Sequence, residues 1–224
     1  ATAGLTPMPG SLERFYGPHL GSEFDPQKLR IGLSESGWSQ YEILNGYFKL
    51  HPSCAHLHGV NDAVDDLIKS YDLNEDDIER VDISTFKEAI EIDSAAPSND
   101  LAARFSAKAT VAAAIRDGRL TDSALLDLDA LAPLMARITV SHDPHLDKYA
   151  PEGRPGIVSV TLRDGRHVES TVIHPRGTPK INATEEERRS KALDLLSRHY
   201  DKRGVIGIES SIMALHWNSS IEEV

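Results

Sequence analysis

The sequence predicts an α+β fold, in which a mainly antiparallel sheet of about four strands has helices on one face and helical segments flanking it. The order of expected elements supports this class: a helix, a strand, two helices, three strands and two terminal helices. The clearest strand signal lies at residues 157–162 and 167–173, where apolar and polar side chains alternate. Between them stands Asp164-Gly165, a dipeptide typical of tight hairpin turns.

A helix and a strand open the predicted core. Over residues 60–71 apolar side chains recur at the spacing of one helix face. These side chains are Val60, Ala63, Val64, Leu67, Ile68 and Tyr71. Residues 78–85 alternate, which predicts a strand with one buried face. Before this core we expect a short helix at residues 11–16, a loop at 32–37 and a short strand at 38–48.

The middle of the chain predicts two further helices. Asp100 is the expected N-cap of a helix over residues 101–116, which Gly118 closes. A second helix is expected over residues 121–131. It stops at Pro133, because proline removes a helix hydrogen bond and crowds the preceding turn.

Three later elements complete the prediction. A short strand is expected over residues 137–141. Thr184 and Glu187 have the spacing of a capping box, which predicts the start of a helix that runs to about Tyr200 and that Gly204 ends. A last helix is expected over residues 206–217.

Composition narrows the class of protein. The net charge is −11 and no run of Lys or Arg is present, which argues against a nucleic-acid surface. No apolar stretch approaches the length of a membrane span, and the first residues lack the pattern of a signal peptide. The single cysteine excludes an internal disulfide and fits a reducing compartment, so we expect a cytoplasmic location.

A histidine cluster precedes the first core helix. His51, His56 and His58 fall within eight residues, close to Lys49 and the cysteine, Cys54. His58 is expected in the first turn of the helix, where unpaired backbone N–H groups create positive potential. A histidine in that position tends to stay neutral near pH 7, the form that can take a proton from carbon.

Three other interpretations of the cluster stay open on periodicity alone. His58 could simply cap the helix. The three histidines could bind zinc, although their spacing lacks the i, i+4 pair or the cysteine pair of common zinc motifs. The cluster could also be a solvated loop.

The motif around these histidines resembles the central motif of the MmgE/PrpD family, which includes 2-methylcitrate dehydratases, cis-aconitate decarboxylases and iminodisuccinate epimerases. The matching residues are Lys49, Pro52, Cys54, His58, Asp62 and Ala63. Four later segments agree with the family in order, at residues 76–81, 103–106, 160–166 and 174–177. The resemblance covers nearly the whole chain.

This resemblance implies a domain organisation. Residues 46–178 correspond to an α+β lid domain that the family inserts between two pieces of a large helical domain. Residues 1–45 are then the segment that leads in from that helical domain, which we expect to be missing from this sequence. Residues 179–224 are expected to be C-terminal helices that return to it.

The resemblance also implies roles for particular residues. His58 corresponds to the active-site histidine of the lid, serving as base or acid. Lys49 corresponds to a catalytic-site cation that binds a substrate carboxylate, and Arg104 and His56 are expected as further substrate contacts. The family implies no metal and no organic cofactor.

Several of these side chains also have plain structural interpretations. Arg104 could form only a surface salt bridge near a helix start. Lys108 and Arg176 are weaker candidates, because charges on a helix face or in a turn are usually solvated. Cys54 is expected to pack rather than to act as a nucleophile. Two later histidines, His142 and His145, flank a turn and are expected at the surface.

The expected function is that of a 2-methylcitrate dehydratase-like lyase, which removes a proton beside a carboxylate of a di- or tricarboxylate. Half of the active site would lie on this chain and the rest on a helical-domain partner, in a homo- or hetero-oligomer. Epimerisation and decarboxylation stay open, because Ala109 stands where the family often has tyrosine. A binding or assembly module that kept the fold is the non-catalytic alternative.

Overall fold

The computed structural model describes residues 45–214 and, before them, residues 14, 18, 25, 33–34 and 37–38. By its contacts the chain divides into two compact units, Ala1–Gly46 and Tyr47–Val224. In the first unit, β1 (Leu33–Ser34) and β2 (Gly37–Trp38) pair antiparallel, so the prediction of a loop at residues 32–37 was wrong in part.

Part of the prediction for the chain termini falls outside the described residues. This applies to most of the expected helix at 11–16 and of the expected strand at 38–48, and to the end of the last helix beyond residue 214. Residues 46–48, which are described, have no regular secondary structure.

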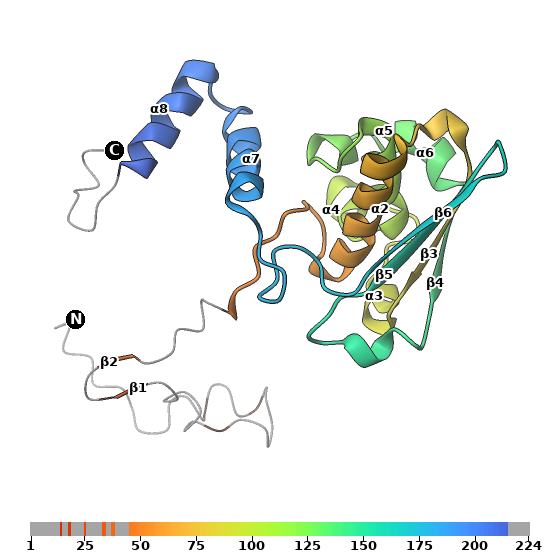
Figure 1. Ribbon diagram of the computed structural model, residues 1–224, viewed down its shortest axis with the longest axis horizontal. Helices are drawn as coiled ribbons and strands as arrows, with labels where there is room; N and C mark the ends of the chain where they lie inside the picture. Colours follow the sequence, from red (N-terminus) through yellow and green to blue (C-terminus); the bar gives the residue numbers. More distant parts are fainter. Residues whose placement is uncertain are drawn as a thin grey trace. The chain divides into compact units, whose positions relative to one another are not determined.

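The second unit is built on a four-stranded sheet with the order β4-β3-β5-β6 (Figure 1). The strands are β3 (Ile78–Thr85), β4 (Ile138–His142), β5 (Gly156–Leu162) and β6 (His167–Val172). β5 pairs antiparallel with both β3 and β6, whereas β3 and β4 are parallel. The parallel pair is possible because the chain between these two strands is long enough to form a helical crossover. The predicted α+β class with a mainly antiparallel sheet is confirmed.

The hairpin predicted between β5 and β6 is confirmed. Thr161 pairs with His167, and the register continues to Gly156 opposite Val172. Gly165 has φ +87°, in the left-handed region that favours glycine in tight turns. Its N–H donates to the carbonyl of Leu162 at 2.9 Å.

Two helices cover one face of this sheet (Figure 1): α2 (His58–Tyr71) and α5 (Ala107–Asp117). Along β5 every second residue is buried, as the alternation predicts. Val158 and Val160 of β5 pack with Val64 of α2 and Ala113 of α5 in one apolar core. The polar side chains between the buried positions lie on the opposite face.

The helix expected over residues 101–116 is two helices, so that prediction was wrong. α4 (Asp100–Ala103) ends before Arg104, and α5 begins only at Ala107. Ser106 is in an extended conformation and accepts a hydrogen bond from the N–H of Ala109, which makes it an N-cap. Asn99, not Asp100, caps α4. A second capping residue inside the predicted helix therefore interrupts it, whereas the end at Gly118, with φ +73°, is confirmed.

The second predicted helix is also displaced. Its place is taken by a short 3₁₀ turn, η6 (Ser123–Leu125), and by α6 (Leu128–Met135), which Asp127 caps. Pro133 lies inside α6 rather than after it. Pro133 has no N–H, so α6 lacks one backbone hydrogen bond. The helix tolerates this loss because it extends only two residues beyond the proline.

The C-terminal part forms two helices. The predicted capping box is confirmed: Thr184 and Glu187 bond each other's backbone at the start of α7 (Glu185–Leu196). The predicted end at Gly204 was wrong, because α8 (Lys202–Met213) already begins before it. Asp201 caps α8 by accepting from the N–H of Gly204 at 2.8 Å.

The described structure also contains short helical segments that the sequence did not predict. They are η4 (Ala55–Leu57), η5 (Glu75–Asp77), α3 (Lys87–Glu91) and η7 (Asp147–Tyr149). Phe86, just before α3, is buried in a small second cluster with Ala89 and Leu146. This cluster lies at the end of β3 where the crossover begins.

Two glycines allow the start of α2 to lie directly against the sheet. A Cβ on Gly59 would overlap the carbonyl oxygen of Arg154, and a Cβ on Gly156 would overlap the backbone of Val60. Glycine at both positions lets the two backbones approach, as a side chain would force them apart. This contact fixes where the neighbouring His58 lies.

We expect Gly59→Ala to lower the free energy of unfolding by about 1–3 kcal/mol or more, the usual cost of overpacking a close contact. Urea denaturation followed by circular dichroism measures the change. The matched control is Gly207→Ala in α8, where an added Cβ meets no atom within 4 Å. A helical alanine should be neutral or mildly stabilising there. Equal stability of the two variants would contradict the close approach.

Candidate active site

His58, the first residue of α2, is completely buried. Its Nε2 lies 3.4 Å from the carbonyl oxygen of Ser53, and its Nδ1 contacts the hydroxyl of Tyr47. A carbonyl can only accept, so Nε2 carries the proton of the neutral ring. Nδ1 then accepts from the Tyr47 hydroxyl, and both ring nitrogens are occupied.

The pKa of His58 is lowered to about 3, chiefly by burial and also by the nearby His51, whereas the Ser53 carbonyl and Asp62 act in the opposite direction. The ring is therefore neutral near pH 7, as expected, but burial rather than the helix terminus is the main cause. The capping alternative is wrong, since the N-cap residue is Leu57 and no side chain caps α2.

His51 belongs to a buried polar network that the sequence analysis did not assign. Its Nε2 lies 2.7 Å from Oδ1 of Asp62, and both residues are at most 5% exposed. The same oxygen accepts from Nε and Nη2 of Arg176 at 3.0 and 2.8 Å. The backbone N–H of Arg176 donates to Oδ2 at 2.7 Å.

The charges of this network stabilise one another. Burial alone would raise the pKa of Asp62, but the hydrogen bonds and charges of His51 and Arg176 hold it below its usual range. Arg176 also pairs with Asp65 at 3.0 Å and with Glu187 at 3.2 Å. Because Glu187 also belongs to the capping box of α7, the network connects α2, the segment after β6 and α7.

Among the described residues, one group could offer a metal three ligands: His51, Asp62 and Asp65, whose ligand atoms lie within 4.8 Å of one another. The guanidinium of Arg176 already occupies both carboxylates. The zinc arrangement considered from the sequence does not form. His56 packs against Phe86, with ring centroids 5.5 Å apart, and does not join His51.

His56 lies apart from the expected substrate contacts. It belongs to η4, and its buried Nδ1 has no hydrogen-bond partner among the described residues. Burial, followed by the charge of Arg154, lowers its pKa. His56 lines none of three pockets that Asp122 lines.

A basic pocket of about 350 Å³ lies beside His51. It is lined by Lys49, His51, Pro52, Ser53, Cys54, Arg104, Phe105, Asp122, Lys191 and Leu195. Three of these side chains are cationic, whereas Asp122 is the one acid among the described lining residues. We call it the basic pocket, and both Lys49 and Arg104 line it. Cys54 lies at its wall, partly buried, and packs against the apolar core.

Lys191 of α7 was missed by the sequence analysis. Its Nζ donates to the carbonyl oxygen of Lys49. Burial lowers its pKa, Asp122 raises it, and Lys49 and Arg198 lower it again. No signal in the sequence indicates this role, because Lys191 reaches the pocket only through the packing of α7.

Arg104 forms a salt bridge, as its structural interpretation predicts, and it also lines the basic pocket. Its guanidinium pairs with Asp122 and donates to the carbonyl of Pro52 at 3.3 Å, while its side chain also lines the basic pocket. Asp122 pairs in addition with Arg198 at 2.7 Å. Burial raises the pKa of Asp122, but its two arginine partners lower it overall.

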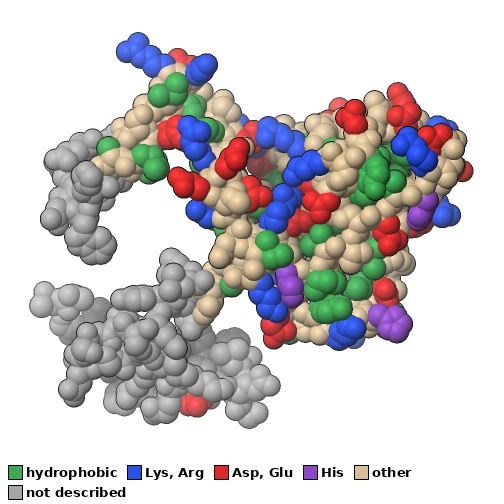
Figure 2. Space-filling model, in the orientation of Figure 1, with side chains coloured by type: hydrophobic (Ala, Val, Ile, Leu, Met, Phe, Trp, Pro, Cys, Tyr) green, Lys and Arg blue, Asp and Glu red, His purple; other side chains and the backbone are tan. Residues whose placement is uncertain are grey.

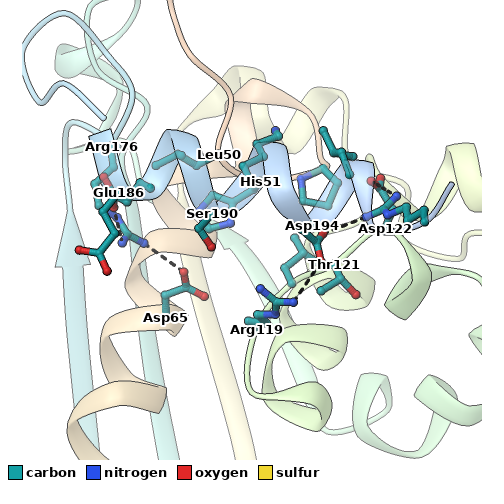
Figure 3. A pocket seen from close by; sticks show the side chains of 16 residues that line it. Leu50, His51, Asp65, Arg119, Thr121, Asp122, Arg176, Glu186, Ser190 and Asp194 are labelled. Atoms are coloured by element: carbon teal, nitrogen blue, oxygen red, sulfur yellow. Dashed lines mark hydrogen bonds and ion pairs between the residues drawn. The ribbon is translucent and has the colours of Figure 1, made fainter. Parts of the chain in front are cut away.

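A second pocket of about 340 Å³ adjoins the first and shares His51, Asp122 and Lys191 with it (Figure 3). α7 crosses it, with Arg176 and Asp65 at one end and Asp194 near Asp122 at the other. In Figure 2, basic and acidic side chains are mixed along the surface where α7 meets the α+β part. This pocket is therefore polar and nearly balanced in charge, unlike the basic pocket.

The remaining candidates lie elsewhere. Lys108 lines none of these pockets. Ala109 is completely buried in the apolar core, so it contributes no polar group to either pocket. His142 forms a surface hydrogen bond with Asp147 at 3.0 Å, and His145 is exposed.

An α+β domain that gathers three basic side chains and one histidine, His51, around one pocket can hold a small anion there. The profile of the MmgE/PrpD C-terminal domain matches residues 51–214, and the chain belongs to the MmgE/PrpD family. This family is of the dehydratase or lyase type. Comparison with curated proteins gives no match. Within the described part of the chain, no helix has the length and apolar character needed to cross a membrane.

We expect Arg176→Gln to lower the free energy of unfolding by about 3–5 kcal/mol at pH 7, because it leaves the buried Asp62 carboxylate without its cation. The control is Arg166→Gln, which breaks an exposed pair with Asp164 and should have no measurable effect. Urea denaturation of both variants tests this.

The same experiment has a defined pH dependence. Because the folded-state pKa of Asp62 is lowered, its contribution is fully present above its unfolded pKa of about 3.9 and is lost as pH falls through the folded value. The stability difference between wild type and Arg176→Gln should therefore shrink below about pH 4. A difference that stays constant far below that pH would contradict the charge interaction.

Proposed function

We propose that this chain forms the lid part of a 2-methylcitrate dehydratase-like lyase that acts on a di- or tricarboxylate by removing a proton beside a carboxylate. The observation that carries the proposal is the basic pocket, which adjoins the histidine cluster. Such a reaction needs cations that hold the carboxylates and groups that transfer protons. Both kinds of group lie within this one region.

The charges of the pocket support a substrate with more than one carboxylate. Lys49, Lys191 and Arg104 line it, and Asp122 is already paired with two arginines. Lys49 has only a 3.3 Å contact with the carbonyl of Ser53, so its ammonium keeps donors for an anion. A chain with net charge −11 can bind an anion only where cations are concentrated locally, as they are here.

His58 is the proposed base, and the Tyr47 hydroxyl that contacts it is the proposed route for the proton, although neither residue lines the basic pocket. The neutral form of His58 is the one that accepts a proton. Because its Nδ1 contacts the Tyr47 hydroxyl, His58 can receive a proton through this phenol, or directly once Tyr47 moves aside. Burial keeps the Tyr47 phenol protonated by raising its pKa, despite the lowering charge of Arg154.

Dehydration also needs an acid for the leaving hydroxide, and the family's tyrosine is replaced by Ala109. Since Ala109 is enclosed in the core, another side chain must supply this proton. Without such a group the chemistry would stop at proton removal and return, which is epimerisation.

Packing on a helical-domain partner, from the same chain or another, is part of the proposal. Large apolar side chains are exposed along and between α7 and α8, and they support such an interface. They are Leu195, Tyr200, Ile206, Ile212 and Met213. We expect residues 1–224 alone to show no turnover of 2-methylcitrate, cis-aconitate or iminodisuccinate, and turnover to appear when the helical domain is added. Robust turnover by residues 1–224 alone would contradict a shared site.

Two variants separate binding from chemistry in the assembled enzyme. His58→Gln should lower kcat by roughly 10²–10⁴, the usual contribution of a positioned acid or base, because glutamine keeps a polar side chain but takes no proton. Lys49→Met should instead weaken binding of citrate by about 10- to 100-fold, as a charge-assisted hydrogen bond is lost. Steady-state kinetics and isothermal titration calorimetry measure the two effects.

Lys69→Met is the control for Lys49→Met, since Lys69 is exposed in the last turn of α2 and lines none of the pockets. It should bind citrate as the wild type does. A His58→Gln protein with unchanged kcat, or equal affinity of the two lysine variants, would end the proposed assignments. Citrate binding without turnover of any family substrate would favour a binding module.

A further inference from the structure

We infer that His51, positioned by Asp62, is a second proton-transferring group of this site and donates the proton that converts the leaving hydroxide to water. The inference rests on the proposed function, because it requires a carboxylate substrate in the basic pocket. It assigns the acid that the replacement of tyrosine by Ala109 leaves missing.

His51 is the histidine that a ligand of the pocket can reach. It lines both the basic pocket and the adjoining pocket, whereas His58 lines neither and is completely buried. The two rings are nevertheless in contact, with centroids 5.1 Å apart and planes at 87°. A molecule held by Lys49 would therefore meet His51 before it could meet His58.

Asp62 fixes the orientation of the His51 ring. Because a carboxylate can only accept here, Nε2–H of His51 donates to Oδ1 of Asp62 at 2.7 Å. In the neutral ring Nδ1 then keeps its lone pair, and among the described residues no hydrogen bond involves this atom. A carboxylate that fixes the tautomer and the ring orientation of a histidine leaves the other nitrogen free to exchange protons with a ligand.

Arg176 in turn keeps Asp62 from turning away from His51. It donates to the carboxylate with its backbone N–H, Nε and Nη2. Those three bonds involve both carboxylate oxygens. Proton transfer requires groups that are held in a fixed geometry, because small displacements of the reacting groups reduce the rate steeply.

In the proposed step each histidine moves one proton. His58 takes the proton beside the carboxylate, directly or through Tyr47, and the electrons of the broken C–H bond form the carbon–carbon double bond. The C–O bond breaks, and the oxygen leaves with its electron pair. Nδ1–H of doubly protonated His51 gives its proton to this oxygen, so water leaves and His51 returns to its neutral form. Exchange with solvent restores both histidines.

The first test observes His51 without any turnover. Two-dimensional ¹H–¹⁵N spectra of the chain labelled with ¹⁵N-histidine report which ring nitrogen carries the proton, with citrate as the probe. We expect His51 as the Nε2–H tautomer without citrate, and a shift of its Nδ1 signal on citrate addition that Lys49→Met abolishes. His167, on β6 at the exposed end of the sheet, is the control and should not move.

The outcomes distinguish the inference from the proposed function. Citrate binding that depends on Lys49 but leaves His51 unmoved would overturn the inference and leave the basic pocket standing. No citrate-dependent change at any residue would overturn the pocket and the inference with it. An Asp62→Asn variant that folds yet keeps the wild-type His51 tautomer ratio would overturn the positioning role of Asp62.

The second test is kinetic and uses the enzyme assembled with its helical domain. His51→Gln should lower kcat for dehydration of 2-methylcitrate by roughly 10²–10⁴ while KM changes by less than about threefold, because glutamine can still bond Asp62 but gives no proton. His167→Gln is the matched control. A purely structural His51 would instead lower the melting temperature in His51→Gln and leave kcat unchanged, which would overturn the inference.

Discussion

The contact between Arg176 and Asp62 holds the site together. Asp62 lies on α2 almost completely buried, and a carboxylate there is tolerated only because a guanidinium and an imidazole satisfy its oxygens. Arg176 follows β6 and also pairs with Glu187, which belongs to the capping box of α7. A single cation thus connects α2, the segment after β6 and α7 around one pocket.

That arrangement concentrates positive charge in a strongly acidic chain. Arg176 neutralises carboxylates at one end of the region, and Arg104 and Arg198 neutralise Asp122 at the other. The lysines between them, Lys49 and Lys191, have no carboxylate partner among the described residues. The pocket is basic because the nearby carboxylates are already paired with arginines, so they do not neutralise the two lysines.

The three clustered histidines show how strongly environment separates identical side chains. His58 is enclosed between Tyr47 and Ser53, and burial favours its neutral form. His56 packs on Phe86 outside the pockets. His51 lies at the pocket wall in contact with Asp62. Only the last combines access with a fixed ring orientation, although the motif draws attention to the first.

The sequence by itself determined the features that depend on near neighbours: the β5–β6 hairpin, the capping box of α7 and the apolar face of α2, because turn residues, caps and periodicity act locally. The same local rules missed the break at Ser106, where a second cap competes with helix continuation. Lys49 and His58 were proposed as site residues from a motif in one segment. Only the tertiary structure decided the parallel pairing of β4, the burial of His58 and the approach of Lys191, because strand partners, desolvation and charge contacts depend on groups that are distant along the chain.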